Sequence, residues 1–152
     1  MYFMRLLGKY LGDGSSLYAY CLMDNHFHLL LRVDLDGELM TQSLSNLFNA
    51  YAKAFNKATG RTGSLFEKHF KRIRIDNENY LRQLIVYIHL NPKHHFDIDF
   101  TGFKYSSYNS FLSYKETRLL RDDVIALFGD VDNFKYTHVF RKEILDEKFM
   151  LE

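Results

Sequence analysis

Two histidines stand two residues apart in the stretch DNHFHLLLR, residues 24–32. Alternate side chains of a strand lie on the same face, so His26 and His28 would project together, roughly 6–7 Å apart at the backbone. Paired imidazoles in this arrangement suit joint coordination of one metal ion. Two histidines held by local hydrogen bonds are the competing interpretation, and the spacing alone leaves it open.

A second polar group is predicted on a helix over about residues 78–90. Gln83, Tyr87 and Asn91 are each four residues apart, so they would lie above one another on a flank of the apolar stripe. Tyr87 could act as a nucleophile there, and Asn91 or Gln83 could offer an oxygen to a metal. His89 falls about 160° away from Tyr87 and is excluded from this stripe. A tyrosine packed at a helix–sheet seam is the commoner structural interpretation.

Basic residues concentrate in one segment, although the net charge of the chain is only +1. A local basic patch can bind polyanions even when the whole protein is near neutral. A solvated charged face is equally compatible with this pattern. The segment carries one acid, Glu67, and seven bases: Lys53, Lys57, Arg61, Lys68, Lys71, Arg72 and Arg74.

Length and composition predict one globular domain. The 152 residues are 47% hydrophobic, enough for a substantial core, and no apolar run reaches the ~18–20 residues that span a bilayer. Arg5 and Lys9 interrupt the N-terminal segment, so no export signal is expected. Cys21 is the only cysteine, which excludes an internal disulfide. We therefore expect a cytoplasmic protein without a membrane anchor.

The elements that would position these residues follow from periodicity and caps. Residues 2–11 predict a helix, and residues 17–23 and 26–33 predict a hairpin that turns at Asp24-Asn25. Residues 38–58 predict a long helix ending at Gly60. The end of residues 63–76 predicts a basic strand. The next helix should begin at about Glu78, capped by Asp76 or Asn77, and should end at Asn91-Pro92. A last helix is predicted before Gly129. This order favours an α+β fold with a small antiparallel sheet.

Three blocks of the chain resemble a known family in order: AYCLMDNHFHLLLRV, then GSLFEKHFKRIRIDNENYLRQLIVYIHLNP, then YSSYNSFL. They are similar to the single-tyrosine transposases of the HUH (His-hydrophobic-His) superfamily, and most of all to the REP-associated tyrosine transposases. The resemblance covers most of the chain. It implies a ferredoxin-like antiparallel sheet with helices on one face. It also implies a single domain over residues 1–152, with a core of about 1–113 and a helical extension of about 114–152.

The resemblance also implies roles for particular residues. His26 and His28 match the metal-binding pair, Tyr87 matches the nucleophile, and Asn91 matches the third, polar metal ligand. Such enzymes cut single-stranded DNA beside a hairpin with Mg²⁺ or Mn²⁺, leaving a 5′-phosphotyrosine and a free 3′-hydroxyl. Two histidines alone would favour zinc or manganese, whereas a carboxamide ligand and phosphate oxygens favour Mn²⁺ or Mg²⁺. The expected DNA contacts are Lys68, Lys71, Arg72 and Arg74. Candidate stacking surfaces for unpaired bases are Phe66, Phe70, Tyr105 and Tyr108, although a position in the core is the commoner role for each of them.

The sequence departs from the family pattern at three places. Family members usually begin with an additional strand, which would pair beside the histidine strand, and this chain opens inside the following helix. Either the chain is a fragment or a truncated gene product, or a partner chain or another segment fills the gap. Asp24 stands where the family usually has proline, and KHHFDIDF follows Asn91-Pro92 in place of a small and apolar continuation.

Three functions are therefore distinguished. The first is a metal-dependent DNA strand transferase using Tyr87, acting in transposition and recombination as a monomer or homodimer. The second is a transposase remnant that binds DNA hairpins without cutting them. The third is a ferredoxin-like RNA-binding module, which is disfavoured because the sheet offers histidines where such modules place aromatic residues.

Overall fold

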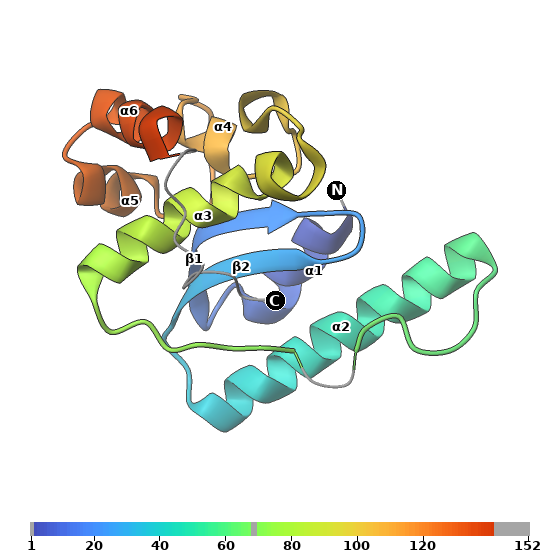
Figure 1. Cartoon of the computed structure of the whole chain (residues 1–152). Helices are drawn as coiled ribbons and strands as arrows, with labels where there is room; N and C mark the ends of the chain where they lie inside the picture. Colours follow the sequence, from blue (N-terminus) through green and yellow to red (C-terminus); the bar gives the residue numbers. More distant parts are fainter. Residues whose placement is uncertain (1, 68–69, 142–152) are drawn as a thin grey trace. The chain divides into compact units, whose positions relative to one another are not determined.

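The chain forms an α+β structure with six helices and a two-stranded antiparallel sheet among the residues described (Figure 1). The computed structural model describes residues 2–67 and 70–141. The chain divides into two compact units, Met1–Ser16 with Arg32–Arg72, and Leu17–Leu31 with Ile73–Glu152. No helix in the described part is long and apolar enough to cross a bilayer.

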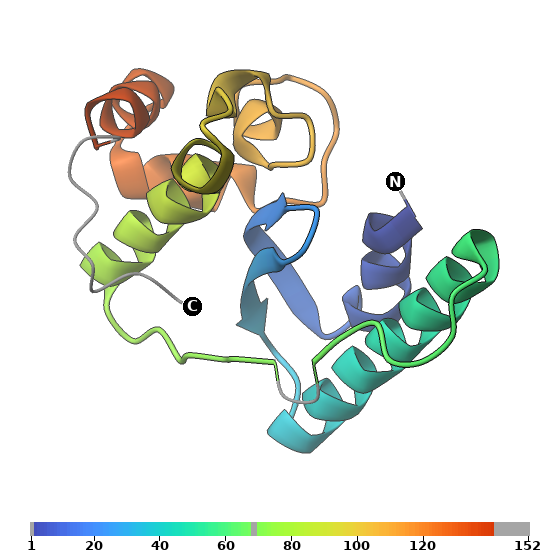
Figure 2. The ribbon, with the colours of Figure 1, turned by 45° about the vertical axis from the view of Figure 1, so that its right-hand side comes forward.

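The first unit is built on two helices, α1 (Tyr2–Leu11) and α2 (Gly37–Thr59), as predicted. They lie side by side (Figure 2), with the Phe3 ring 5.1 Å from the Tyr51 ring in an edge-to-face contact. Full burial of such a side chain contributes roughly 1.5–3 kcal/mol, so these helices are held mainly by their apolar faces. The buried residues of the pair are Phe3, Leu6, Leu7, Leu11, Met40 and Leu47.

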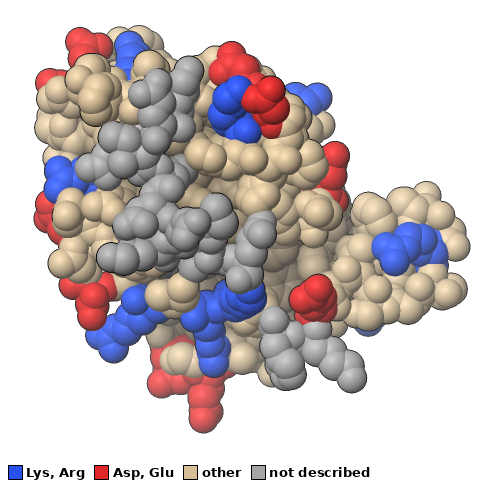
Figure 3. Space-filling view, in the orientation of Figure 1, with Lys and Arg blue, Asp and Glu red and all other residues tan. Residues whose placement is uncertain are grey.

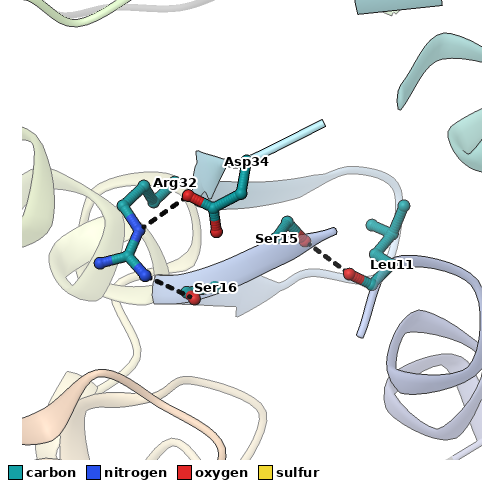
Figure 4. Close-up of polar contacts among 5 residues, drawn as sticks. All are labelled: Leu11, Ser15, Ser16, Arg32 and Asp34. Atoms are coloured by element: carbon teal, nitrogen blue, oxygen red, sulfur yellow. Dashed lines mark hydrogen bonds and ion pairs between the residues drawn. The ribbon is translucent and has the colours of Figure 1, made fainter. Parts of the chain in front are cut away.

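Short polar contacts fix the chain where it leaves α1 and where the hairpin ends (Figure 4). The Ser15 hydroxyl donates to the carbonyl oxygen of Leu11 at 2.9 Å. The Arg32 guanidinium donates to the Ser16 hydroxyl at 3.3 Å and pairs with Asp34 at the same distance. These groups are partly or fully exposed, so the contacts orient the chain at these two points but add little to the free energy of unfolding.

Both ends of α2 carry the expected signals. The Asp36 side chain accepts from the backbone N–H of Glu38 at 2.8 Å, and Gly60 ends the helix with φ of 66°. The basic strand predicted near the end of residues 63–76 is wrong, because no strand occurs in the described part of that segment. Its aromatic residues instead pack on α2, where the Phe66 and Phe70 rings lie 5.1 and 5.4 Å from Phe48.

The hairpin of the second unit matches its prediction. Strands β1 (Ser15–Leu22) and β2 (Phe27–Val33) run antiparallel and turn at Asp24-Asn25, where the Met23 N–H donates to the His26 carbonyl at 2.8 Å. The other edge of β1 is also hydrogen-bonded. The backbone N–H of Ser107 donates to the Tyr20 carbonyl at 3.0 Å. The backbone N–H of Leu120 donates to the Leu17 carbonyl, also at 3.0 Å. Distant segments therefore fix the position of β1.

Helix α3 (Glu78–Phe96) begins as predicted, with the Asn77 side chain accepting from the N–H of Tyr80 at 3.0 Å. The predicted end at Asn91-Pro92 is wrong, because the helix continues through Pro92 to Phe96. Proline removes one backbone hydrogen bond, but Pro92 is buried and packing outweighs that loss. The helix ends at Asp97, whose φ is 53° and whose N–H bonds to the Lys93 carbonyl.

The remaining elements of the second unit surround α3. They are η1 (Phe100–Gly102), α4 (Tyr108–Phe111), α5 (Arg121–Phe128) and α6 (Val131–Arg141). Gly129 ends α5 with φ of 88°, as expected. Helices α5 and α6 both pack on α3 (Figure 1), and Phe134 of α6 is fully buried. This aromatic packing holds the helix that carries the predicted nucleophile.

Candidate functional site

The two histidines lie at the start of the hairpin's second strand. His26 directly precedes β2 and His28 is its second residue. Their ring centroids are 5.3 Å apart, with the ring planes at 81°. Two imidazoles bound to one ion at ~2.1 Å would have centroids about 5 Å apart, so this separation is compatible with a shared ion. An edge-to-face contact between the rings has the same separation, and the distance alone does not choose between them.

Helix α3 lies on the histidine face of the hairpin. The Tyr87 ring is 5.7 Å from the His28 ring, and the His95 ring is 5.0 Å from the His26 ring. Tyr87, Asn91 and His95 are four residues apart and therefore share one side of the helix, spanning about 12 Å. Because both ends of this row touch the histidine pair, Asn91 lies on the helix between the two contacts.

Asn91 and His26 each leave a buried acceptor without a hydrogen-bond partner. The Asn91 side chain is fully buried, and its amide nitrogen donates to the Tyr87 carbonyl at 2.9 Å. Its oxygen Oδ1 and the Nε2 nitrogen of His26 have no hydrogen-bond partner in the described structure. Buried polar atoms are normally satisfied, so an unpartnered acceptor on the α3 row and another on the histidine pair it contacts indicate that a further group belongs there.

A divalent cation fits these atoms chemically. Imidazole nitrogen and carboxamide oxygen both bind manganese, and each offers a lone pair that a cation would satisfy. Among the described residues, no three His, Cys, Asp or Glu side chains come together as a ligand set. A metal held here would therefore depend on the Asn91 carboxamide and on oxygens from water or from a bound molecule. His26, His28 and Asn91 are the residues that would hold it.

Tyr87 is buried, with 4% of its surface exposed. It lies in the run of nine consecutive buried residues of α3 that extends from Leu84 to Pro92. A phosphate could therefore react with this phenol only by reaching a side chain that is almost fully buried. Gln83, the other residue of the predicted polar stripe, is half-buried one turn earlier.

The predicted DNA-binding residues are placed as follows. Lys71, Arg72 and Arg74 are exposed, and Arg72 donates to the Thr41 hydroxyl at 3.2 Å. Lys68 lies outside the described residues. Lys71 and Arg72 belong to the first unit, whereas Arg74 belongs to the second unit together with the histidine pair. Lys57, in the last turn of α2, and Arg61, just after it, are also exposed. Figure 3 shows lysine and arginine side chains on the surface of this part of the first unit.

The aromatic candidates for base stacking differ in exposure. Tyr108 is buried and forms part of the core of the second unit, so it is not a stacking surface. Phe66 and Phe70 rest against Phe48 of α2. Tyr105 is 40% exposed, and the Lys104 ammonium lies 4.8 Å from its ring centre. Tyr105 therefore combines an accessible ring with an adjacent positive charge, which is the pairing that single-stranded nucleic acid binds.

His95 is a member of the site that sequence reasoning missed. It continues the four-residue spacing of Tyr87 and Asn91, which was a usable signal. Because the sequence predicts that the helix ends at Pro92, His95 is expected to be a solvated loop residue, with a DNA contact as the alternative. Because α3 continues for one further turn, His95 reaches the His26 ring.

His89, excluded from the polar stripe, belongs to a separate buried network. Its Nδ1 lies 2.9 Å from His138 Nε2, and its Nε2 lies 2.7 Å from the Ser107 hydroxyl. His138 Nδ1 contacts the Phe134 carbonyl at 2.7 Å, and both histidines are fully buried. Burial, followed by the charge of His138, holds the pKa of His89 well below its usual value. A substrate has no access to these rings, so the network joins α3 to α6 instead of performing chemistry.

No protein-family model matches this chain, and no curated protein sequence or solved structure is similar enough to count as a match.

Proposed function

We propose that this protein cleaves and rejoins single-stranded DNA beside hairpins, in the manner of the HUH single-tyrosine transposases that its sequence resembles, on a ferredoxin-like variant of the α+β fold. The observation that carries the proposal is the approach of the Tyr87 ring to within 5.7 Å of His28. A nucleophile and a metal-binding pair from distant parts of the sequence would have to meet in this way.

The chemistry assigned to Tyr87 is a transesterification. Its phenolic oxygen forms a bond to the phosphorus while the bond from phosphorus to the 3′ oxygen breaks. The phenol loses its proton and the departing 3′ oxygen gains one, so a 5′-phosphotyrosine and a 3′-hydroxyl result. Attack of a 3′-hydroxyl on this intermediate reverses the step and rejoins the strand.

The surrounding residues support this reaction. A free tyrosine has a pKa near 10 and is a poor nucleophile at neutral pH. A divalent ion, Mg²⁺ or Mn²⁺, bound by His26, His28 and Asn91 would polarise the phosphate and stabilise the transition state. Asn91 also has a structural role, because its amide nitrogen donates to the Tyr87 carbonyl and this contact fixes the orientation of the carboxamide. Lys71, Arg72 and Arg74 would supply salt-sensitive phosphate contacts.

The test uses the whole chain with a hairpin DNA that carries a 5′ single-stranded extension and a 3′ label. With Mn²⁺, we expect a protein–DNA adduct that survives denaturing electrophoresis. Tyr87→Phe removes the phenolic oxygen and should abolish the adduct. Tyr80→Phe, on the same helix, is the matched control and should retain it. An adduct formed by Tyr87→Phe would exclude Tyr87 as the nucleophile.

A second candidate is hairpin DNA binding without cleavage, and the burial of Tyr87 favours it. In that case the hairpin is retained in a mobility-shift assay, and neither Mg²⁺ nor Mn²⁺ yields an adduct. Tighter binding of single-stranded RNA than of DNA of the same sequence would contradict both candidates and favour an RNA-binding module.

A further inference from the structure

Asn25 occupies the hairpin turn and forms a side-chain contact with its neighbour His26. The Nδ1 nitrogen of His26 lies 2.7 Å from the Asn25 oxygen Oδ1. A carboxamide oxygen can only accept a hydrogen bond, so Nδ1 must carry the proton. In a neutral imidazole the other nitrogen, Nε2, then carries the lone pair.

The lone pair of His26 Nε2 is buried and has no hydrogen-bond partner. The opposite tautomer would place an N–H at this buried position, with no described acceptor, and would set two lone pairs of Nδ1 and Asn25 against each other. Only one tautomer is therefore compatible with the contact. This arrangement is the one that metal-binding histidines adopt, in which the remote nitrogen donates to an oxygen and the near nitrogen binds the ion.

The Asn91 oxygen is the second buried acceptor without a partner, and it lies on the α3 row that contacts both histidine rings. A bound cation would satisfy the lone pairs of His26 Nε2 and Asn91 Oδ1, and so would a water molecule that donates to both. Asn25, in the exposed turn, is therefore connected through the His26 ring to a buried nitrogen of the site.

We infer that Asn25 is a positioning residue, which holds His26 as the Nδ1–H tautomer and so presents Nε2 to a divalent cation. The inference rests on the proposed function, because the cation is the one assigned to that reaction. Asn25 itself touches neither the cation nor the DNA in this role. Its effect on metal affinity passes through the orientation and tautomer of one imidazole ring.

Two measurements on the full chain at pH 8 test this inference. Long-range ¹H–¹⁵N correlation spectra distinguish the tautomers of neutral histidines, and the His26 signal is assigned by its loss in His26→Asn. Titration with Mn²⁺, followed by the electron paramagnetic resonance of the free ion, gives the affinity. The variants are Asn25→Ala, which removes the acceptor, and Asn25→Asp, which retains it. Asn79→Ala is the matched control, since Asn79 is exposed on α3 and contacts Arg82.

The wild type should show His26 as the Nδ1–H tautomer. Asn25→Ala should mix the tautomers and weaken Mn²⁺ binding by about 10- to 100-fold. Asn25→Asp should keep both the tautomer and the affinity, and Asn79→Ala should change neither. An Nε2–H tautomer in the wild type, or equal Mn²⁺ affinities of the wild type and Asn25→Ala, would overturn the inference while leaving the proposed function intact. A wild type that shows the Nδ1–H tautomer and binds no Mn²⁺ would overturn the metal-dependent function and, with it, the cation role of Asn25.

Discussion

His89 of α3 and His138 of α6 face each other through a single hydrogen bond of 2.9 Å between Nδ1 and Nε2, with both rings fully buried. The contact between His138 Nδ1 and the Phe134 carbonyl requires a proton on Nδ1, so His138 Nε2 accepts from His89. His89 Nε2 then accepts from the Ser107 hydroxyl, which lies 2.7 Å away. The neutral form of each ring is therefore part of the folded structure.

The neutral histidines predict that stability falls in mild acid. Burial lowers the pKa of His138 to about 4 from 6.5. The unfolded chain binds a proton near pH 6.5 and the folded chain does not, so stability is full above pH 6.5 and is lost as the pH falls toward 4. The shift corresponds to about 3 kcal/mol at this site. Urea unfolding at pH 7.5 and pH 4.5 measures it. His138→Leu should show a smaller difference between the two pH values, and an unchanged difference would contradict the assignment.

The same hydrogen bond predicts energetic coupling between the two helices. His138→Leu leaves the buried N–H of His89 without an acceptor and should cost roughly 1–3 kcal/mol at pH 7.5. His89→Leu should cost a similar amount, because it removes an acceptor of the Ser107 hydroxyl and leaves the buried His138 Nε2 without a donor. The free energy of unfolding lost in the double variant should be smaller, by roughly 0.5–3 kcal/mol, than the sum of the losses in the two single variants. Strict additivity in chemical denaturation would show that the bond contributes no coupling.

We expect Asn91→Asp to lower the thermal stability of the metal-free protein and to increase the stabilisation by Mn²⁺. The carboxylate is buried and loses the amide that donates to Tyr87, which should cost roughly 3 kcal/mol and lower Tm by about 6–12 °C in EDTA. A carboxylate is also a stronger ligand for a divalent ion, so Mn²⁺ should raise the Tm of Asn91→Asp more than that of the wild type. Asn109→Asp, at an exposed asparagine, is the control. Equal Mn²⁺ shifts in Asn91→Asp and the wild type would argue against Asn91 as a ligand.

The exposed basic residues predict the salt dependence of DNA binding. Each phosphate contact to a single strand contributes about 0.7 to the slope of log affinity against log salt concentration. The triple variant Lys71→Ala, Arg72→Ala, Arg74→Ala should therefore bind more weakly and reduce that slope by about 2. A control with the same charge change is Lys115→Ala, Arg118→Ala, Lys135→Ala, all exposed. Equal slopes for the two variants would show that the effect is net charge and not contact.

The space around Gly14, in the first unit, is too small for a larger side chain. A Cβ atom there would lie 2.0 Å from the Leu35 side chain, so Gly14→Ala forces that side chain to move. We expect a loss of about 1–3 kcal/mol. Gly37→Ala is the control, because a Cβ at Gly37 meets nothing within 4 Å and should be neutral or slightly stabilising. The midpoint of urea unfolding compares the two, and a tolerated Gly14→Ala would mean that Leu35 repacks at no cost.

The sequence alone determined the local elements of this protein. The caps at Asn77 and Gly60, the Asp24-Asn25 turn and the periodicity of α1 and α2 act over a few residues, and the structure contains each of them. The four-residue spacing of Tyr87 and Asn91 likewise placed both on one side of a helix before any tertiary contact was considered.

Only the tertiary structure decided where α3 ends and what its polar side meets. Pro92 signals a helix end locally, but the packed core of the second unit carries the helix on to Phe96 and brings His95 to His26. The basic segment has a strand-like alternation, yet its aromatic side chains find partners on α2. Packing between distant residues contributes more free energy than one hydrogen bond or a local propensity, so it overrides these signals.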